Sequence, residues 1–266
     1  MAPASARRRA ARIQYRLPAG ERFRIVSRAK WLLKAELPGG LYVNLLRQEG
    51  GFTANCQTLS VKNGWTKIRV TMEDIKGAAE VLGRGFAIDP AVAMGPLVPA
   101  VEGDTFVVDK SLWGELGEVE GAPALKKVLG DMRVQSILLF FGTHFPHREV
   151  VPGQRWEYED HWSLKWPFVP IIQPQATRVK VRCQFRRWIP FSGQECPEVA
   201  QEIAVEPEAE RFGFYRVEGA GSGRIVFEPE FGKIARSEKR LRLDLKPRIG
   251  GGGSWRVEME TSSWHE

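Results

Sequence analysis

The sequence predicts a mainly β protein with one main helix, built from two similar curved antiparallel β-sheets that each resemble half a barrel. Three observations carry this prediction. Several segments alternate apolar and polar residues with a period of two, as half-buried strands do. Two of these segments, half a chain length apart, resemble each other. A single segment near the middle of the chain has apolar residues at helical spacing.

The composition is that of a folded, soluble protein. Of the 266 residues, 43% are hydrophobic and 27% are charged, which is ordinary for a globular chain. Nine Trp and fourteen Phe offer large apolar surfaces for a core. We therefore expect disorder only at the ends of the chain.

An internal repeat is the strongest organisational signal. The stretch GERFRIVSRAKWLLK, which starts at Gly20, shares its opening Gly-x-Arg-aromatic pattern and its alternation with GQRWEYEDHWSLKWP, which starts at Gly153. Both stretches interrupt the apolar face at the same step, with Ser27 and Asp160. A duplication explains these matches. The predicted organisation is a basic flexible tail over 1–12, a first β-rich half over 13–122, a helical connector over 123–142 and a second β-rich half over 143–266.

The second half contains a hairpin whose charges indicate its register. Its two strands alternate over 178–185 and 198–205. The pairing that matches the apolar faces also sets Arg178 against Glu206, Arg182 against Glu202 and Arg186 against Glu198. Opposite charges across a ladder stabilise a pairing, and a slip of one residue would swap the faces. In this register Cys183 and Cys196 lie on opposite faces, so we expect no disulfide between them.

The remaining elements follow from periodicity and turn residues. Further strands are expected near residues 13–17, 22–34, 41–47, 53–61, 65–72, 106–109, 240–245 and 255–260. Segment 78–99, rich in Gly and Pro, is predicted to be irregular, Pro229–Gly232 to be a tight turn and the GGGGS run to be a flexible loop. The helix is expected from Pro123, which suits a first helical turn, to Phe140. The run 137–141 also fits a buried strand.

The positive charge is concentrated at the N-terminus. Four arginines, Arg7, Arg8, Arg9 and Arg12, lie in a stretch of twelve residues that has no acid. A basic tail can bind nucleic acid, but no aromatic residues interleave with these arginines, so nucleic acid is not an expected partner. No apolar run is long enough to span a bilayer. No apolar stretch follows the arginines, so the chain as written has no signal peptide and reads as cytoplasmic. A truncated or misassigned start would make it periplasmic or exported.

Motifs that carry chemistry are absent. The sequence has no GxSxG, P-loop or HExxH motif, and its three cysteines form no zinc-type cluster. His144 and His147 are interpreted as residues of a surface loop. GAGSGR at Gly219–Arg224 is flanked by strands rather than followed by a helix, which argues against phosphate binding. We therefore predict no catalytic residue, no metal site and no cofactor.

An aromatic row in the second half is the most unusual feature. The alternating apolar face of 156–168 is dominated by Trp. Such a row forms either an ordinary core or the lining of an apolar pocket under a curved sheet. As ligand-binding residues we select Trp156, Trp162, Trp166 and Phe168.

Two short motifs resemble a group of uncharacterised secreted bacterial proteins. One is the Pro-Gly pair followed by Trp in Val151–Trp156, and the other is Gly-x-Gly-x-x-x-Phe-Glu-x-x-x-Gly over Gly221–Gly232. The chain also resembles the half-barrel of lipoprotein carriers, a curved sheet with a helix over it, mainly over residues 123–245. This resemblance implies a secreted or cell-envelope protein with an apolar ligand, and it carries over no catalytic residue. The N-terminus departs from the pattern because it has no signal peptide or lipobox.

Three functions are weighed on these grounds. The first is a non-enzymatic binding protein that holds a lipid-like or other apolar ligand in a β-cup. The second is a structural or assembly subunit that docks on a larger protein complex through its basic tail and sheet edges. The third, a hydrolase with a site assembled from distant residues, has no local motif to support it.

Overall fold

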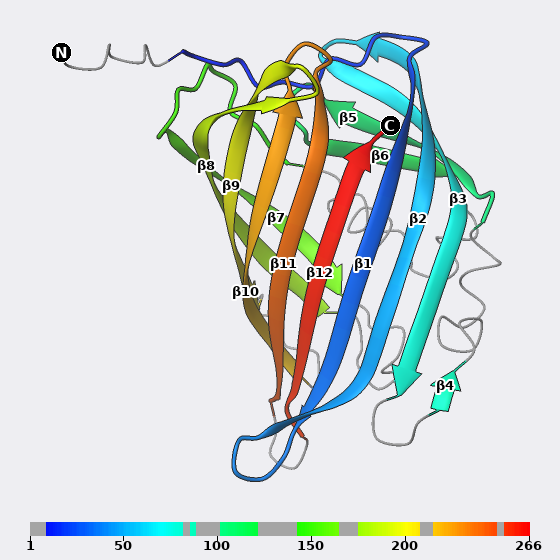
Figure 1. Ribbon diagram of the computed structural model, residues 1–266, viewed down its shortest axis with the longest axis vertical. Coiled ribbons are helices and arrows are strands. Elements are labelled where there is room, and N and C mark those ends of the chain that lie inside the picture. Colours follow the sequence, from blue (N-terminus) through cyan, green and yellow to red (C-terminus); the bar gives the residue numbers. More distant parts are fainter. Residues whose placement is uncertain are drawn as a thin grey trace.

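The computed structural model describes residues 9–81, 86–88, 102–121, 143–164, 175–207, 215–248 and 253–266. The regular secondary structure of these residues is all β. Twelve strands form one sheet, which curves so that the strands at its two edges lie behind its central strands (Figure 1). The strands are β1 (Arg22–Glu36), β2 (Tyr42–Lys62), β3 (Trp65–Val81), β4 (Phe86–Ile88), β5 (Thr105–Ser111), β6 (Leu116–Gly121), β7 (Arg155–Leu164), β8 (Gln175–Phe191), β9 (Gln194–Pro207), β10 (Tyr215–Glu228), β11 (Lys233–Pro247) and β12 (Trp255–His265).

The strand order shows that the two expected sheets are one. The order is β6-β5-β3-β2-β1-β12-β11-β10-β9-β8-β7, with β4 beside β3. The first strand and the last lie side by side at the centre, with Trp31 opposite Met259 and Leu33 opposite Val257. The prediction of two separate sheets is therefore wrong. Two sheets would expose two further edges, whereas the β1–β12 ladder pairs the N–H and C=O groups of those edges. The internal duplication stays a prediction.

The predicted main helix is not found in the described part of the chain. Segment 123–142, where it was expected, lies outside the described residues. A fold class of mainly β with one main helix is therefore corrected to all β for these residues. Among them there is also no helix long and apolar enough to cross a membrane.

Several strands of the first half are longer than their sequence pattern indicates. The segments expected as two strands, 41–47 and 53–61, form the single strand β2. Gly50 and Gly51 in its middle look like a turn, but they lie within the ladder, and a Cβ on Gly51 would lie 2.6 Å from the carbonyl oxygen of Ser27. Strand β3 likewise continues to Val81, into the segment predicted to be irregular. No strand forms at 13–17, and β6 was not predicted.

The β8–β9 hairpin confirms most of the predicted register. Arg182 faces Glu202, and Arg178 faces Glu206 in the same way. A register shift between Phe185 and Arg187 then sets Arg187, and not Arg186, opposite Glu198. The carboxylate of Glu198 is largely buried and pairs with both Arg187 and Arg224. The alternation of apolar and polar residues does not predict such a bulge, because the extra residue of a bulge interrupts that alternation.

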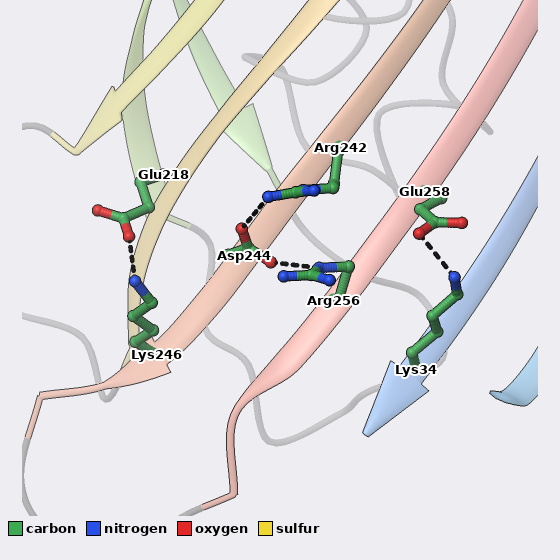
Figure 2. Close-up of polar contacts among 7 residues, drawn as sticks. All are labelled: Lys34, Glu218, Arg242, Asp244, Lys246, Arg256 and Glu258. Atoms are coloured by element: carbon green, nitrogen blue, oxygen red, sulfur yellow. Dashed lines mark hydrogen bonds and ion pairs between the residues drawn. The ribbon is translucent and has the colours of Figure 1, made fainter. Parts of the chain in front are cut away.

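Ion pairs cover the outer face of the central strands. Figure 2 shows Lys34 of β1 beside Glu258 of β12, at 2.6 Å, and Asp244 of β11 between Arg256 and Arg242. The side chains of Lys34, Asp244 and Arg256 are only 16% to 21% exposed. Because these charged side chains lie on the outer face, the apolar residues that alternate with them lie on the inner face.

The inner face carries two main hydrophobic clusters. The larger lies mainly on β7 to β12 and the smaller on β1, β2, β3, β5 and β6. Residues 9–20, the N-terminal segment, cross one end of the sheet (Figure 1) and contribute Ile13 and Tyr15 to the larger cluster and Leu17 to the smaller. Backbone hydrogen bonds hold the segment, from Ala11 N to Val150 O at 2.7 Å and from Arg16 N to Gly232 O at 2.9 Å. This segment therefore joins the two clusters.

Candidate ligand-binding cavity

A cavity of about 70 Å³ lies within the smaller cluster. Its walls are the inner faces of β1, β2, β3 and β5, closed by the N-terminal segment and the start of β11. The described residues that line it are Tyr15, Leu17, Phe23, Ile25, Phe52, Ala54, Cys56, Ile68, Val70, Met72, Phe106, Val108, Lys110, Leu116, Lys233, Ile234 and His265.

Strand periodicity places these walls. Ile68, Val70 and Met72 of β3 alternate with polar residues and point to the inner face. Phe106 and Val108 of β5 are buried two residues apart and point to the same face. Strand β2 contributes two small side chains, Ala54 and Cys56, to the same wall. Small side chains between large ones leave space that the neighbours do not fill.

Three basic groups line this otherwise apolar cavity. Lys110 continues the inward row of β5, and its Nζ lies 3.5 Å from the ring centroid of Tyr15. Lys233 opens β11, and His265 closes β12. The described lining residues include no Asp or Glu. The wall therefore combines basic groups with apolar side chains.

Burial shifts the protonation of two of these groups. Loss of hydration lowers the pKa of Lys110 to about 7, with the Cys56 thiol raising it and Lys239 lowering it to smaller extents. Burial also lowers the pKa of His265 to about 3, and the nearby Lys110 and Lys233 add to this. The His265 ring stacks on Phe23 at 5.3 Å, and its buried Nδ1 has no hydrogen-bond partner in the described part of the chain.

The structure places the predicted aromatic residues elsewhere or does not describe them. Trp156 packs half-buried against the larger cluster, and its Nε1 donates to the carbonyl oxygen of His144 at 2.9 Å. It does not line the cavity. The backbone of Trp162 pairs with Thr177 in β7–β8, but its side chain, and all of Trp166 and Phe168, lie outside the described residues. The assignment of these residues to a ligand stays a prediction.

A polar cluster lies under the aromatic row. His144, predicted to be on a surface loop, instead stacks on Tyr158 at 4.3 Å and is only 19% exposed in its side chain. Its Nε2 lies 3.5 Å from an Asp160 carboxylate oxygen. Burial lowers the pKa of His144 and raises the pKa of Asp160, so both neutral forms are favoured. Sequence reasoning missed this pair because the loop and the strand meet only in the fold.

Gln201 ties this cluster together. It is 2% exposed, and its Nε2 lies 3.3 Å from both the Thr143 hydroxyl and the Tyr158 hydroxyl. These contacts fix the segment that starts at Thr143 against the sheet.

Burial raises the pKa of Cys183 to about 12, and it raises the pKa of Cys56 to about 12 as well. Neither thiol therefore forms the thiolate that a nucleophile requires. No group of three or more metal-ligating side chains occurs among the described residues.

The glycine-rich stretch GAGSGR, predicted to be flanked by strands, itself lies within the single strand β10. Gly219 and Gly221 face the inner side, where a Cβ would lie 2.6 Å from Leu243 and 2.9 Å from Leu241. The glycines therefore leave room for the leucines of β11 to lie over β10.

Sequence reasoning also missed the basic groups of the cavity. Lys110 had a readable signal, since it continues the inward alternation of Phe106 and Val108. Lys233 and His265 had none, because only the β1–β12 pairing brings the end of the chain to the first half.

Comparisons with known proteins give the fold alone. No protein-family model matches the chain, and no curated protein matches it in sequence. A solved structure of lipid–protein interactions in lipovitellin is similar, with a TM-score of 0.54 and 12% identity over 94% of this chain and 25% of that one. This chain thus spans a quarter of that protein. The hypothetical lipoprotein YmcC from Escherichia coli (K12) matches with 11% identity over 92% of this chain and 87% of its own, but its TM-score of 0.28 carries no argument. The expected resemblance is thus supported only at the level of a lipovitellin-like β-sheet fold.

Proposed function

We propose that this protein is a non-enzymatic binding protein that holds a lipid-like or other apolar group on the inner face of its curved sheet. One observation carries the proposal: the cavity in the smaller cluster, which is lined mainly by apolar side chains. Ligand sites are typically concave and mostly apolar, with a few placed polar groups. The lipovitellin-like fold is compatible with this function.

The size of the cavity narrows the kind of ligand. At about 70 Å³ it is smaller than an engineered apolar cavity of about 150 Å³ that binds benzene. It therefore suits one unbranched chain rather than a ring or several chains. Any remainder of the ligand would lie outside the cavity.

The assembly function has less support in the described residues. Two arginines of the basic tail contact this chain itself: Arg9 pairs with Glu195 at 3.2 Å and lies over Trp188, and Arg12 lies over Trp113. The other tail arginines lie outside the described part. The sheet edges β6 and β7 are present, but nothing about them selects a partner.

Octanol binding followed by methyl NMR tests the proposal. We expect octanol to shift the Ile68 and Met72 methyl signals of the cavity wall and to leave the Leu243 signals of the larger cluster unchanged. Ala54→Leu, which fills the cavity from β2, is expected to abolish the shifts. Ala220→Leu makes the same change on the outer face of β10 and is expected to preserve them. Shifts that persist in Ala54→Leu would refute the site.

A further inference from the structure

The basic groups of the cavity come from three strands that meet in space. Lys233 and His265 lie near the same end of the β11–β12 pair, since Arg236 is opposite Trp264 in its ladder. All three groups line the same cavity, and both Lys110 and Lys233 lie close enough to His265 to lower its pKa. Their gathering is therefore a property of the fold and not of one segment.

This arrangement is costly when the cavity is empty. A lysine held away from water among apolar side chains loses hydration that no carboxylate replaces among the described lining residues. The Tyr15 ring, 3.5 Å from the Lys110 Nζ, offsets part of that cost through a cation–π contact. The buried, unpartnered Nδ1 of His265 adds a second polar atom at the wall that requires a partner.

The surrounding wall restricts what can supply the missing charge. Val70, Met72 and Phe106 are each at most 6% exposed and line the same space. A small anion would lose its hydration in this cavity, and pairing with the basic groups would replace only part of that lost free energy. An anion that carries an alkyl chain gains from burying the chain as well, by about 0.8 kcal/mol for each buried CH₂.

We propose that the ligand is a single-chain amphiphile with an anionic headgroup, a carboxylate or a phosphate monoester, that lies among Lys110, Lys233 and His265 with its chain against Val70, Met72 and Phe106. This inference rests on the proposed function, because it names the chemical class of the ligand in the same cavity. The headgroup pairs with the lysines, and the chain occupies the apolar wall.

Calorimetric titration of the full chain with octanoate, octyl phosphate and 1-octanol tests this inference. The three share one chain and differ in the headgroup. We expect at least one anion to bind tenfold or more tightly than octanol. The anion that binds more tightly identifies the headgroup as a carboxylate or a phosphate monoester. Inorganic phosphate and acetate, which have no alkyl chain, are expected to bind at least tenfold more weakly than the matching amphiphile. Equal or tighter binding of these small anions would overturn the amphiphile proposal.

Two lysine variants supply the matched comparison. Lys110→Met keeps the length of the side chain and removes its charge, and it is expected to weaken binding of the anion at least tenfold relative to binding of octanol. Lys62→Met, at an exposed position at the end of β2, is expected to change neither. Circular dichroism confirms that each variant is folded.

The outcomes separate the inference from the function on which it rests. If octanol binds as tightly as both anions, and Lys110→Met changes the affinity for none of the three, the headgroup inference is overturned. The proposal of an apolar binding cavity is then retained. If neither octanol nor the anions bind, the proposed function fails as well.

Discussion

Lys110 lies in an environment that is unusual for a lysine. The strand places it on the inner face, the apolar wall removes its water, and burial lowers its pKa to about 7 from an ordinary value of 10.5. A protein retains such a group at a cost in stability, and functional sites are where such costs concentrate. Lys239, whose pKa is lowered to about 8 by burial, shares this character on the other side of the inner face.

Removing the charge of Lys110 is expected to stabilise the protein in a pH-dependent way. Between pH 7 and pH 10.5 the unfolded chain binds the proton that the folded chain has released, so the free energy of unfolding of the wild type rises with pH. Lys110→Met lacks this dependence. The variant is therefore expected to be more stable near pH 7, and to lose that advantage towards pH 10.5. The fall in the pKa of Lys110 from 10.5 to about 7, at about 1.4 kcal/mol per pKa unit, sets an upper limit of about 5 kcal/mol on the advantage.

Urea unfolding at several pH values between 6.5 and 10.5 measures this difference. Lys62→Met serves as the control, because its side chain is exposed and its effect is expected to be small at every pH. A stability difference for Lys110→Met that does not change with pH would show that the amine keeps its ordinary pKa in the folded protein.

At the scale of elements, the N-terminal segment completes the inner face. Its odd-numbered residues from Ala11 to Leu17 are buried, so a segment that forms only one isolated β-bridge, between Ala11 and Val150, still follows strand periodicity. The segment is seated against the β10–β11 turn, where Gly232 has a φ of 60° and a Cβ would meet the backbone nitrogen of Arg16. Only glycine permits both the turn and the contact.

Gly232→Ala is expected to destabilise the protein more than the same change at Gly193. Both glycines have positive φ, which costs an alanine about 1 to 2 kcal/mol, but a Cβ on Gly193 would have no neighbour within 4 Å. Gly232→Ala must also displace the N-terminal segment, so we expect it to cost at least about 2 kcal/mol more. Chemical denaturation of the two variants gives the comparison. Equal losses would mean that the segment is not held at this turn.

The elements also show how far the sequence can be read. Alternation predicted β1, β7, β8, β9 and β12, and the charges predicted the pairing of Arg182 with Glu202. Two local features made the prediction from alternation wrong. Gly50 and Gly51 have the composition of a turn but lie in a ladder, and the bulge after Phe185 shifts the register that alternation implies.

At the scale of the whole molecule, the pairing of the first strand with the last decides the architecture. Residues Ile25–Ala35 pair with Trp255–His265, so this ladder joins the two ends of the described part of the chain. No local pattern encodes it, which is why two sheets were predicted and one is found. The same pairing brings His265 to the cavity of the first half, so the cavity could not be assembled from either half of the sequence alone.

One continuous sheet is expected to unfold as one unit. Cys56 is buried in the smaller cluster and Cys183 in the larger, and neither forms a disulfide. Each thiol therefore reports on its own cluster when it becomes exposed. Thiol labelling across a urea gradient, read by peptide mass spectrometry, is expected to give the same midpoint for both cysteines. Two separate midpoints would mean that the halves unfold independently despite the shared ladder.

Native mass spectrometry tests most directly whether the curved sheet holds an apolar ligand. The full chain would be purified, incubated with octanoate and measured before and after denaturation. We expect added mass on the folded protein that leaves on denaturation, either from a molecule acquired during expression or from octanoate. We also expect its loss in Ala54→Leu and its retention in Ala220→Leu. A folded wild-type protein that shows only its bare mass after incubation would contradict the account and make the cavity a packing defect of the smaller cluster.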